Sequence, residues 1–280
     1  MNELLAEAEK ENRAVGAFSV GNMEMILGVL AGAEAAGTPV ILQIAEVRLK
    51  HSPLELIGPM MLAAASASPL KIAVHLDHGL SLETIQTALD LGFTSVMFDG
   101  SSLPFPENLA RTKEIAALAH KYGAAAEAEL GIVGGNEGDG ASLAANCTDP
   151  NEAERFAAET GIDALAVAIG NAHGRYRQPP KLRFDVLDEI ARRTKVPLVL
   201  HGGSGIPPED FRRAIHMGIR KVNIATAGFE AITCAAKDYL TSAEAPSYFG
   251  LNEAMTAGVR DNVLRHLNIF GKSRESETTE

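Results

Sequence analysis

Histidine and aspartate side chains recur where apolar runs of this sequence end. Asp77 and His78 close one such run, and His173 and His201 stand at the ends of two later ones. Neutral imidazoles are the commonest zinc ligands, and three of them with an open fourth position are typical of a catalytic rather than a structural zinc. If these run ends meet in the fold, His78, His173 and His201 form a catalytic zinc site with Asp77 beside it.

The other histidines have different expected roles. His75 precedes Asp77 by two positions, so in a strand the two share one face while His78 points to the other until the strand ends. We therefore expect His75 to contact the ligands rather than the metal. The remaining histidines in helical or loop segments are expected at the surface or in interfaces: His51, His120, His216 and His266.

Carboxylates accompany the histidines. Glu127 and Glu129 alternate within one run, Asp99 ends another, and Glu137 lies in the long Gly- and Asn-rich segment 131–150. Loops of that length are often functional lids, and a carboxylate on a mobile loop above a metal can move a proton. The alternative is that Glu137 only keeps the loop solvated.

Two late segments suggest an anion site. HGGSG (201–205) and KVNIAT (221–226) offer backbone N–H groups, small side chains and hydroxyls at the position where barrels often bind a phosphate. A tight turn without a ligand is the alternative explanation for the first segment alone.

Eight β-like runs alternate with helical periodicity along the whole chain. Strands that are apolar on both faces and alternate with helices form parallel sheets covered by helices, and eight such units close into a (β/α)8 TIM barrel, an α/β fold. An open doubly wound sheet is the alternative, but it leaves two units without a place. The expected strands are 17–20, 39–44, 71–77, 95–100, 124–130, 164–170, 196–202 and 221–225.

The composition restricts the binding partners and the cellular location that we expect for this protein. A formal net charge of −11 argues against a nucleic-acid partner, and Cys147 and Cys234 form neither a CxxC motif nor a disulfide framework. The N-terminus lacks the apolar core of a secretory signal, and no uncharged run approaches a membrane span. We expect a cytoplasmic protein with no membrane partner, one domain over 1–271, and a flexible tail over 272–280.

The motifs HLDHG, AEAELGIVGGNEG, AIGNAHGRY, VPLVLHGGSGI and KVNIAT, in this order and spacing, resemble the class II, zinc-dependent fructose-bisphosphate and tagatose-bisphosphate aldolase family. The resemblance runs from about residue 4 to 271. It implies one Zn²⁺ on His78, His173 and His201, Asp77 as acid/base on the aldehyde-derived oxygen, and Glu137 as the base on the loop. The implied reaction is reversible cleavage of a ketose 1-phosphate to dihydroxyacetone phosphate and an aldehyde through a zinc-stabilised enediolate.

The resemblance also implies further binding positions. Asp99 and Glu129 match positions that hold a second metal ion in some members or support the ligands. A monovalent cation, Na⁺ or K⁺, near the phosphate and a homodimer or homotetramer are family properties too. The expected residues around the sugar phosphate are Asn22, Gly174, Gly202, Ser204, Asn223 and Thr226.

One departure concerns the second substrate. Many bisphosphate aldolases carry a DPRxxxR-like segment whose arginine reaches the second phosphate, and this chain has SYFGLNE (247–253) there, with no basic residue. We therefore expect an intact ketose-phosphate half and an aldehyde that is unphosphorylated. The alternative is a tagatose- or fructose-1,6-bisphosphate aldolase that supplies the contact from Arg48, Lys50 or a partner subunit.

Two other classes fit less well. Metal-dependent barrel hydrolases typically open with HxH after the first strand, and here SVGNMEM follows it. A non-catalytic subunit would lack the base, whereas Glu137, Asp77 and the three histidines are all present.

Overall fold

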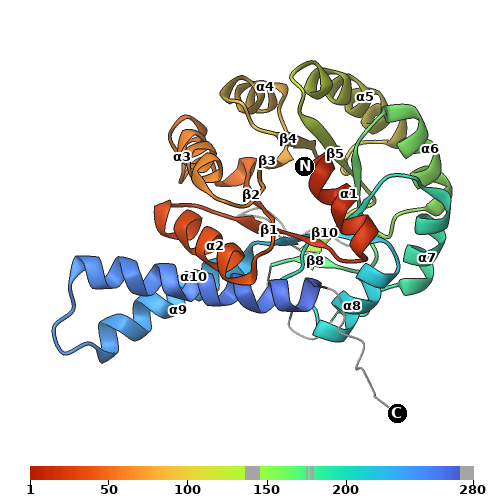
Figure 1. Cartoon of the computed structure of the whole chain (residues 1–280). Coiled ribbons are helices and arrows are strands. Elements are labelled where there is room, and N and C mark those ends of the chain that lie inside the picture. Colours follow the sequence, from red (N-terminus) through yellow and green to blue (C-terminus); the bar gives the residue numbers. More distant parts are fainter. Residues whose placement is uncertain (136–145, 175, 177–179, 272–280) are drawn as a thin grey trace, which may run out of the picture.

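The structure is a computed structural model that describes residues 1–135, 146–174, 176 and 180–271. Within these residues, eight parallel strands close into a barrel in the order β1-β10-β9-β7-β5-β4-β3-β2, surrounded by helices (Figure 1). The fold is therefore the predicted single-domain (β/α)8 barrel, and the open sheet is excluded. The barrel strands are β1 (Val15–Ser19), β2 (Val40–Ala45), β3 (Ile72–Gly79), β4 (Ser95–Phe98), β5 (Ala125–Leu130), β7 (Ala164–Val167), β9 (Leu198–Leu200) and β10 (Ile219–Ile224).

The helices on the outside of the barrel begin and end as the sequence signals indicate. Ser81 and Asp149 accept hydrogen bonds from backbone N–H groups of the first turns that follow them, and Gly37 and Gly92 end helices in the left-handed conformation. Each helix follows a strand in the chain. They are α2 (Met23–Ala36), α3 (Leu54–Ala67), α4 (Leu82–Leu91), α5 (Phe105–Lys121), α6 (Pro150–Thr160), α7 (Phe184–Arg193), α8 (Pro208–His216) and α9 (Thr226–Ser242).

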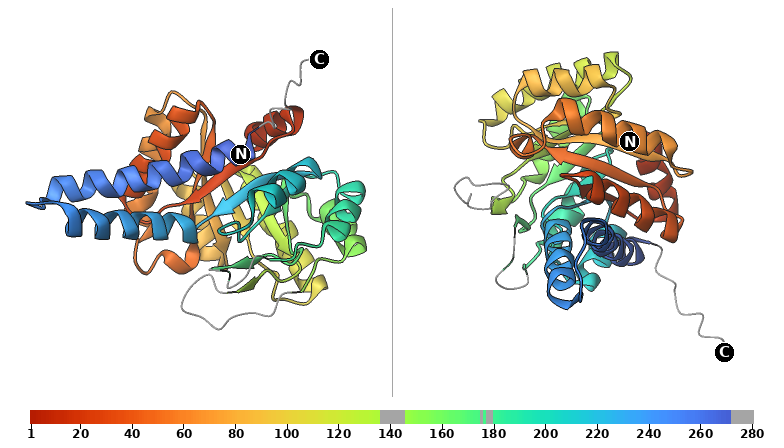
Figure 2. Two further views of the ribbon diagram at one scale, coloured as in Figure 1. Left: turned by 90° about the horizontal axis from the view of Figure 1, so that it is seen from below. Right: turned by 90° about the vertical axis from the view of Figure 1, so that its left-hand side faces the viewer.

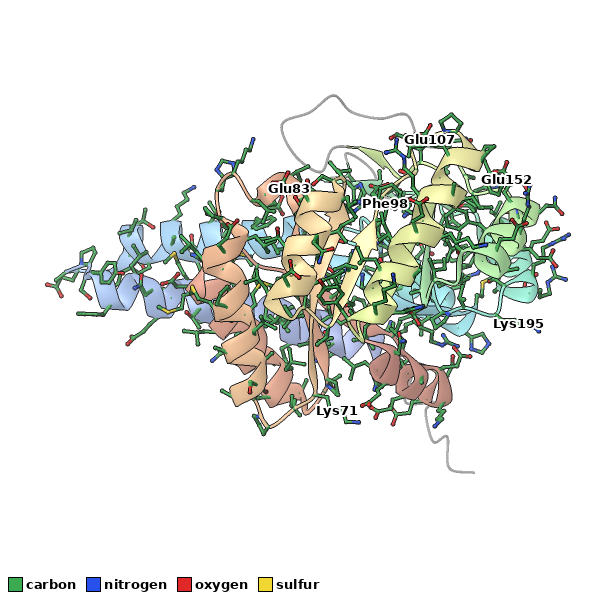
Figure 3. All side chains as sticks on the ribbon, turned by 90° about the horizontal axis from the view of Figure 1, so that it is seen from above. Lys71, Glu83, Phe98, Glu107, Glu152 and Lys195 are labelled. Carbon is green, nitrogen blue, oxygen red and sulfur yellow. The ribbon has the colours of Figure 1, made fainter. Side chains whose placement is uncertain are left out.

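Helix α1 (Asn2–Glu11) covers the amino-terminal end of the barrel. Leu4, Leu5 and Ala8 pack against an apolar layer inside the barrel that includes Ile41 and Val199. In Figure 3, Lys71, next to the start of β3, lies on the side of α1, whereas Phe98, at the end of β4, lies towards the other side. The functional groups must therefore lie at the opposite, carboxyl-terminal end.

Helices α9 and α10 (Tyr248–Phe270) form an antiparallel pair that projects beyond the barrel (Figure 2). The base of α10 packs on α2, where Val259 and Val263 lie close enough to Gly28 and Gly32 that a Cβ at either glycine would clash. The tip carries Tyr248 and Phe249, which are 70% and 74% exposed.

Helix α10 also corrects one expectation. His266 is buried, with its ring among Phe18, Phe211 and Phe270 and its Nδ1 donating to the Asn262 carbonyl 2.8 Å away. The prediction of a surface or interface position was wrong because one satisfied N–H allows an imidazole to pack as an aromatic core residue. The predictions for His51, His120 and His216, which are exposed, are confirmed.

Both cysteines are free thiols, as expected. None of the described helices combines the length and the apolar character that a membrane crossing requires. The predicted tail, 272–280, lies outside the described residues.

Candidate active site

Three histidines from three strand ends meet at the carboxyl-terminal end of the barrel. The potential ligand atoms of His78, His173 and His201 all lie within 4.8 Å of one another. The ring centroid of His78 is 4.9 Å from that of His173 and 4.6 Å from that of His201. The structure therefore brings together the three residues that the sequence selected as metal ligands.

His78 reaches this cluster through an irregularity in β3. Regular alternation would turn its side chain away from Asp77 and out of the barrel. Instead His78 has a φ of 42°, one of two positive values among described non-glycine residues, and the β3–β4 register shifts between Leu76 and Gly79. Bulges of this kind re-aim side chains beside active sites. Gly79 is needed there because a Cβ would lie 2.5 Å from the Met97 carbonyl oxygen.

The hydrogen bonds of two of these rings assign their tautomers. His78 Nδ1 lies 2.7 Å from Asp99 Oδ2, and His201 Nε2 lies 2.9 Å from Glu127 Oε1. Because a carboxylate only accepts, both nitrogens donate, which leaves lone pairs on His78 Nε2 and His201 Nδ1. These two atoms face each other at 2.8 Å.

Two facing lone pairs require a cation between them, either a proton or a metal ion. The third imidazole beside them, His173, supplies another nitrogen of the same kind. A set of neutral imidazoles with carboxylates on their far sides is the usual arrangement of a zinc-type site. The donor set therefore fits a divalent metal.

Electrostatics keep the His201 ring neutral. Burial, together with the cost of placing a further positive charge beside His78 and Lys221, lowers the pKa of His201 well below its ordinary value. Burial tends to raise the pKa of Asp99, but its hydrogen bonds with His78 and Ser101 outweigh this and hold that pKa well below its usual range. His201 is thus a neutral imidazole at neutral pH, with one protonated nitrogen and one lone pair, which is the form that binds a metal.

Asp77 lies next to the cluster of three histidines and is 2% exposed. Its Oδ2 accepts from Gln43 Nε2 and its Oδ1 from Asn223 Nδ2, both at 3.0 Å. Gln43 in turn contacts Ser19 Oγ at 3.2 Å. The two amides hold the carboxylate in one orientation beside the imidazoles, as a proton-transferring group needs.

Asp99 and Glu129 form a second group of potential ligands with His78. The two groups share His78, so they are not independent sites. Asp99 also accepts from Ser101 Oγ at 2.6 Å, and Glu129 Oε2 lies 3.5 Å from His201 Nδ1. Both carboxylates therefore contact ligand imidazoles.

The predicted phosphate residues lie on interlocked loops. Ser204 Oγ accepts from the backbone N–H of Ala227 in the first turn of α9, the helix that begins at Thr226. Gly202 has a φ of 62°, and a Cβ there would lie 2.2 Å from the Ala172 carbonyl oxygen. Gly174 also has a positive φ. These loops after β7, β9 and β10 thus form one backbone-rich surface at a helix N-terminus.

Two of the predicted substrate residues have additional contacts. Asn22 caps α2, since its Oδ1 accepts from Met25 N at 3.0 Å. Asn223 lies against Asp77 and within 3.2 Å of His201 Nε2. Asn223 therefore belongs as much to the metal side of the site as to the expected phosphate side.

The long loop after β5 is anchored beside His173. Its short strand β6 (Gly134–Gly135) pairs in parallel with β8 (Ala172–His173), and Ile132 pairs with Asn146. Glu137, the predicted base, lies outside the described residues, as does the middle of the predicted lid.

Sequence reasoning missed three residues of the site, of which Gln43 and Lys221 are buried and Tyr176 is half-buried. Gln43 orients Asp77, Lys221 pairs with Glu127, and the Tyr176 hydroxyl accepts from Ala172 N and donates to the Gly202 carbonyl. Burial raises the pKa of Tyr176 to about 12. A signal for two of them existed, because Gln43 and Lys221 are polar residues inside apolar strands.

The fold and the site together are those of a (β/α)8 enzyme whose three clustered imidazoles fit a divalent metal. The family model described as class-II fructose-bisphosphate aldolase matches residues 1–275. A fructose-bisphosphate aldolase of Geobacillus stearothermophilus is 40% identical over 98% of this chain and 95% of its own length. A 6-phospho-5-dehydro-2-deoxy-D-gluconate aldolase of Shouchella clausii is 43% identical over 81% of this chain and 78% of its own length.

Solved structures agree with this match. The YdjI aldolase from Escherichia coli K12 superposes with a TM-score of 0.87 at 34% identity, covering 99% of this chain and 98% of that chain. The chain belongs to the class II fructose-bisphosphate aldolase family. It is an aldolase, a carbon–carbon lyase, and metal dependence is a trait of its family, so the hydrolase and non-catalytic alternatives are excluded.

Proposed function

We propose that this protein is a zinc-dependent aldolase that reversibly cleaves a ketose 1-phosphate to dihydroxyacetone phosphate and an aldehyde. The observation that carries the proposal is the cluster of three imidazoles with the amide-held Asp77 beside it. His78 Nε2, His201 Nδ1 and His173 would hold the ion. Bound there, zinc would polarise the ketose carbonyl and offset the negative charge that develops on its oxygen.

Asp77 is the proposed acid/base on the aldehyde half. Its carboxylate is fixed by Gln43 and Asn223, so it can give a proton to the oxygen of the newly formed alcohol and remove that proton in cleavage. By the family resemblance, Glu137 takes the C3 proton of dihydroxyacetone phosphate. Two separate carboxylates would then serve the two halves of the reaction.

The ketose phosphate is proposed to bind at the N-terminus of α9. Backbone N–H groups at a helix start and the Ser204 hydroxyl suit an anion, and Gly174 and Gly202 let the backbone come close. A Na⁺ or K⁺ ion beside the phosphate is part of this proposal.

We further propose that the aldehyde is unphosphorylated. The segment at the start of α10, where many bisphosphate aldolases have an arginine, presents the exposed Tyr248 and Phe249 and no basic residue. Arg is the natural bidentate partner of a phosphate. The named relatives at about 40% identity act on different substrates, so identity at this level leaves the aldehyde open.

A bisphosphate substrate is the second candidate, and Arg48 is the observation in its favour. Its guanidinium lies 5.2 Å from the centroid of the Phe229 ring, in the second turn of α9. Arg48 ends the turn η1 (Glu46–Arg48) that follows β2, so it lies at the carboxyl-terminal end of the barrel with the site. A cation there could receive a second phosphate.

A panel of aldehydes separates the two candidates. Zinc-loaded protein is given dihydroxyacetone phosphate with glyceraldehyde 3-phosphate or with unphosphorylated sugar and sugar-acid aldehydes, and kcat/KM is compared. We expect an unphosphorylated aldehyde to react best and Arg48→Met to leave its KM unchanged. If kcat/KM for glyceraldehyde 3-phosphate exceeds that for every unphosphorylated aldehyde by orders of magnitude, and Arg48→Met loses this preference, the protein is a bisphosphate aldolase instead.

The expected homodimer or homotetramer and the cytoplasmic location stay predictions. Light scattering of the purified protein tests the first, and fractionation of cells that express it tests the second.

A further inference from the structure

A buried ion pair crosses the barrel interior beneath the cluster of His78, His173 and His201. Lys221 on β10 and Glu127 on β5 are both fully buried, with Lys221 Nζ 2.8 Å from Glu127 Oε2 and 3.0 Å from Oε1. These strands are not neighbours in the sheet, since β9 and β7 separate them. Taking two charges out of water is costly, and an apolar layer such as the one at the other end of the barrel would avoid that cost.

The ion pair is joined directly to a metal ligand. Glu127 Oε1, which contacts Lys221, also lies 2.9 Å from His201 Nε2. The other neighbour of that nitrogen, Asn223 Nδ2, is a donor that serves Asp77 at 3.0 Å. Glu127 is thus the acceptor that makes His201 Nε2 the protonated nitrogen, and Nδ1 the one that faces His78.

Lys221 fixes the direction of that acceptor. Its ammonium lies close to both carboxylate oxygens, so rotation of Glu127 would break one of two charge-assisted contacts. The nearby His75 is held by Ser95 through Nδ1 at 2.8 Å and leaves Nε2 3.8 Å from Glu127 Oε2, so it closes the other side of the carboxylate. The carboxylate therefore has one arrangement, with Oε1 towards His201.

We infer that Lys221 and Glu127 act as a positioning pair that sets the tautomer and ring orientation of His201, so that Nδ1 is presented to the metal. The inference rests on the proposed metal site. Contacts of this kind behind a ligand typically change metal affinity about 10- to 100-fold when removed. Neither residue is one of the proposed phosphate-binding residues, and both side chains are fully buried.

The test separates metal affinity from folding. Lys221→Met alone and Glu127→Gln alone each leave a buried charge uncompensated and are expected to fold poorly. The double variant Lys221→Met/Glu127→Gln removes both charges at nearly constant volume. Its zinc Kd is measured by competition with a chelator, and its Tm is measured in the metal-free state.

We expect the double variant to melt within a few degrees of the native chain and to bind zinc about 10- to 100-fold more weakly. The control is Lys71→Met, which removes an exposed partner of Glu7 (Nζ to Oε1 2.8 Å) at the other end of the barrel and should leave the zinc Kd unchanged. A double variant that binds zinc as tightly as the native chain would reduce the pair to a structural role.

A second readout requires neither a variant nor a bound metal. ¹⁵N NMR of the histidine rings in the native, metal-free chain should show His201 protonated at Nε2. A native chain in which His201 Nε2 carries no proton would overturn the inference. Failure of the native chain to bind zinc would instead refute the proposed function, while the tautomer would still decide the inference.

Discussion

The two ends of the barrel are built from the same strands with opposite chemistry. At the amino-terminal end, Leu5 of α1 packs against small and branched apolar residues such as Ala166 and Val199. At the carboxyl-terminal end the inward positions hold His201, Glu127 and other polar groups that are just as buried. The apolar packing at the first end needs no particular pairing of side chains. At the second end each buried polar or charged group needs a hydrogen-bond or ion-pair partner. Stability and chemistry are therefore carried by different layers.

Replacing Asp77 with Asn should have the largest effect. The amides of Gln43 and Asn223 remain as neighbours, but the group that moves the proton is lost, so kcat should fall about 10²- to 10⁴-fold. Steady-state kinetics measure the fall, and zinc content by atomic absorption should stay at one per chain. Activity within tenfold of the native enzyme would remove Asp77 from the mechanism.

The opposite result is expected for Leu5→Ala. Leu5 is 1% exposed beneath the barrel, so its truncation should lower the free energy of unfolding by about 2 to 5 kcal/mol. Urea titration measures this, and kcat should stay unchanged because the site lies at the other end. A matched loss of kcat under native conditions would show that the two ends are coupled.

Acid should act on the packing of the outer helices through His266. Burial lowers the pKa of this ring from its ordinary 6.5 to about 4. Below pH 6.5 the unfolded chain takes up a proton that the folded chain refuses, so stability falls as pH drops from about 6.5 to 4. At pH 5 the loss from this one ring is about 2 kcal/mol.

The variant His266→Phe should reduce this pH dependence, which unfolding titrations at pH 7 and pH 5 compare. His120→Gln, at an exposed histidine, is the control and should keep the native dependence. Equal slopes in the native chain and His266→Phe would assign the acid sensitivity to other groups.

The smallest effect is expected for Tyr176→Phe. Its hydroxyl joins the backbone of Ala172, next to the proposed metal ligand His173, to that of Gly202, next to the proposed ligand His201. Losing it should cost about 1 kcal/mol of stability and speed zinc release modestly. Stopped-flow chelation measures the release rate, and an unchanged rate would confine Tyr176 to loop stability.

The sequence predicted the barrel and the meeting of the three histidines for a physical reason. Strand patterning and turn residues are local, and parallel strands in a barrel bring their carboxyl ends together, so His78, His173 and His201 could be placed from position alone. What it could not predict depends on non-local geometry. The turn of His78 into the site needs a register shift against β4, and the Lys221–Glu127 pair joins residues 94 positions apart. The prediction for His266 was wrong because the sequence around a histidine does not show whether its ring is buried in the core or exposed at the surface.

The central claim is the zinc-dependent ketose half-reaction, and hydrogen exchange tests it without choosing an aldehyde. Zinc-loaded protein is incubated with dihydroxyacetone phosphate in D₂O, and loss of one C3 hydrogen is followed by NMR, with Glu137→Ala and metal-free protein as controls. We expect stereospecific exchange that requires zinc and is absent in the variant. A folded, zinc-loaded chain that leaves the C3 hydrogens untouched would contradict the claim.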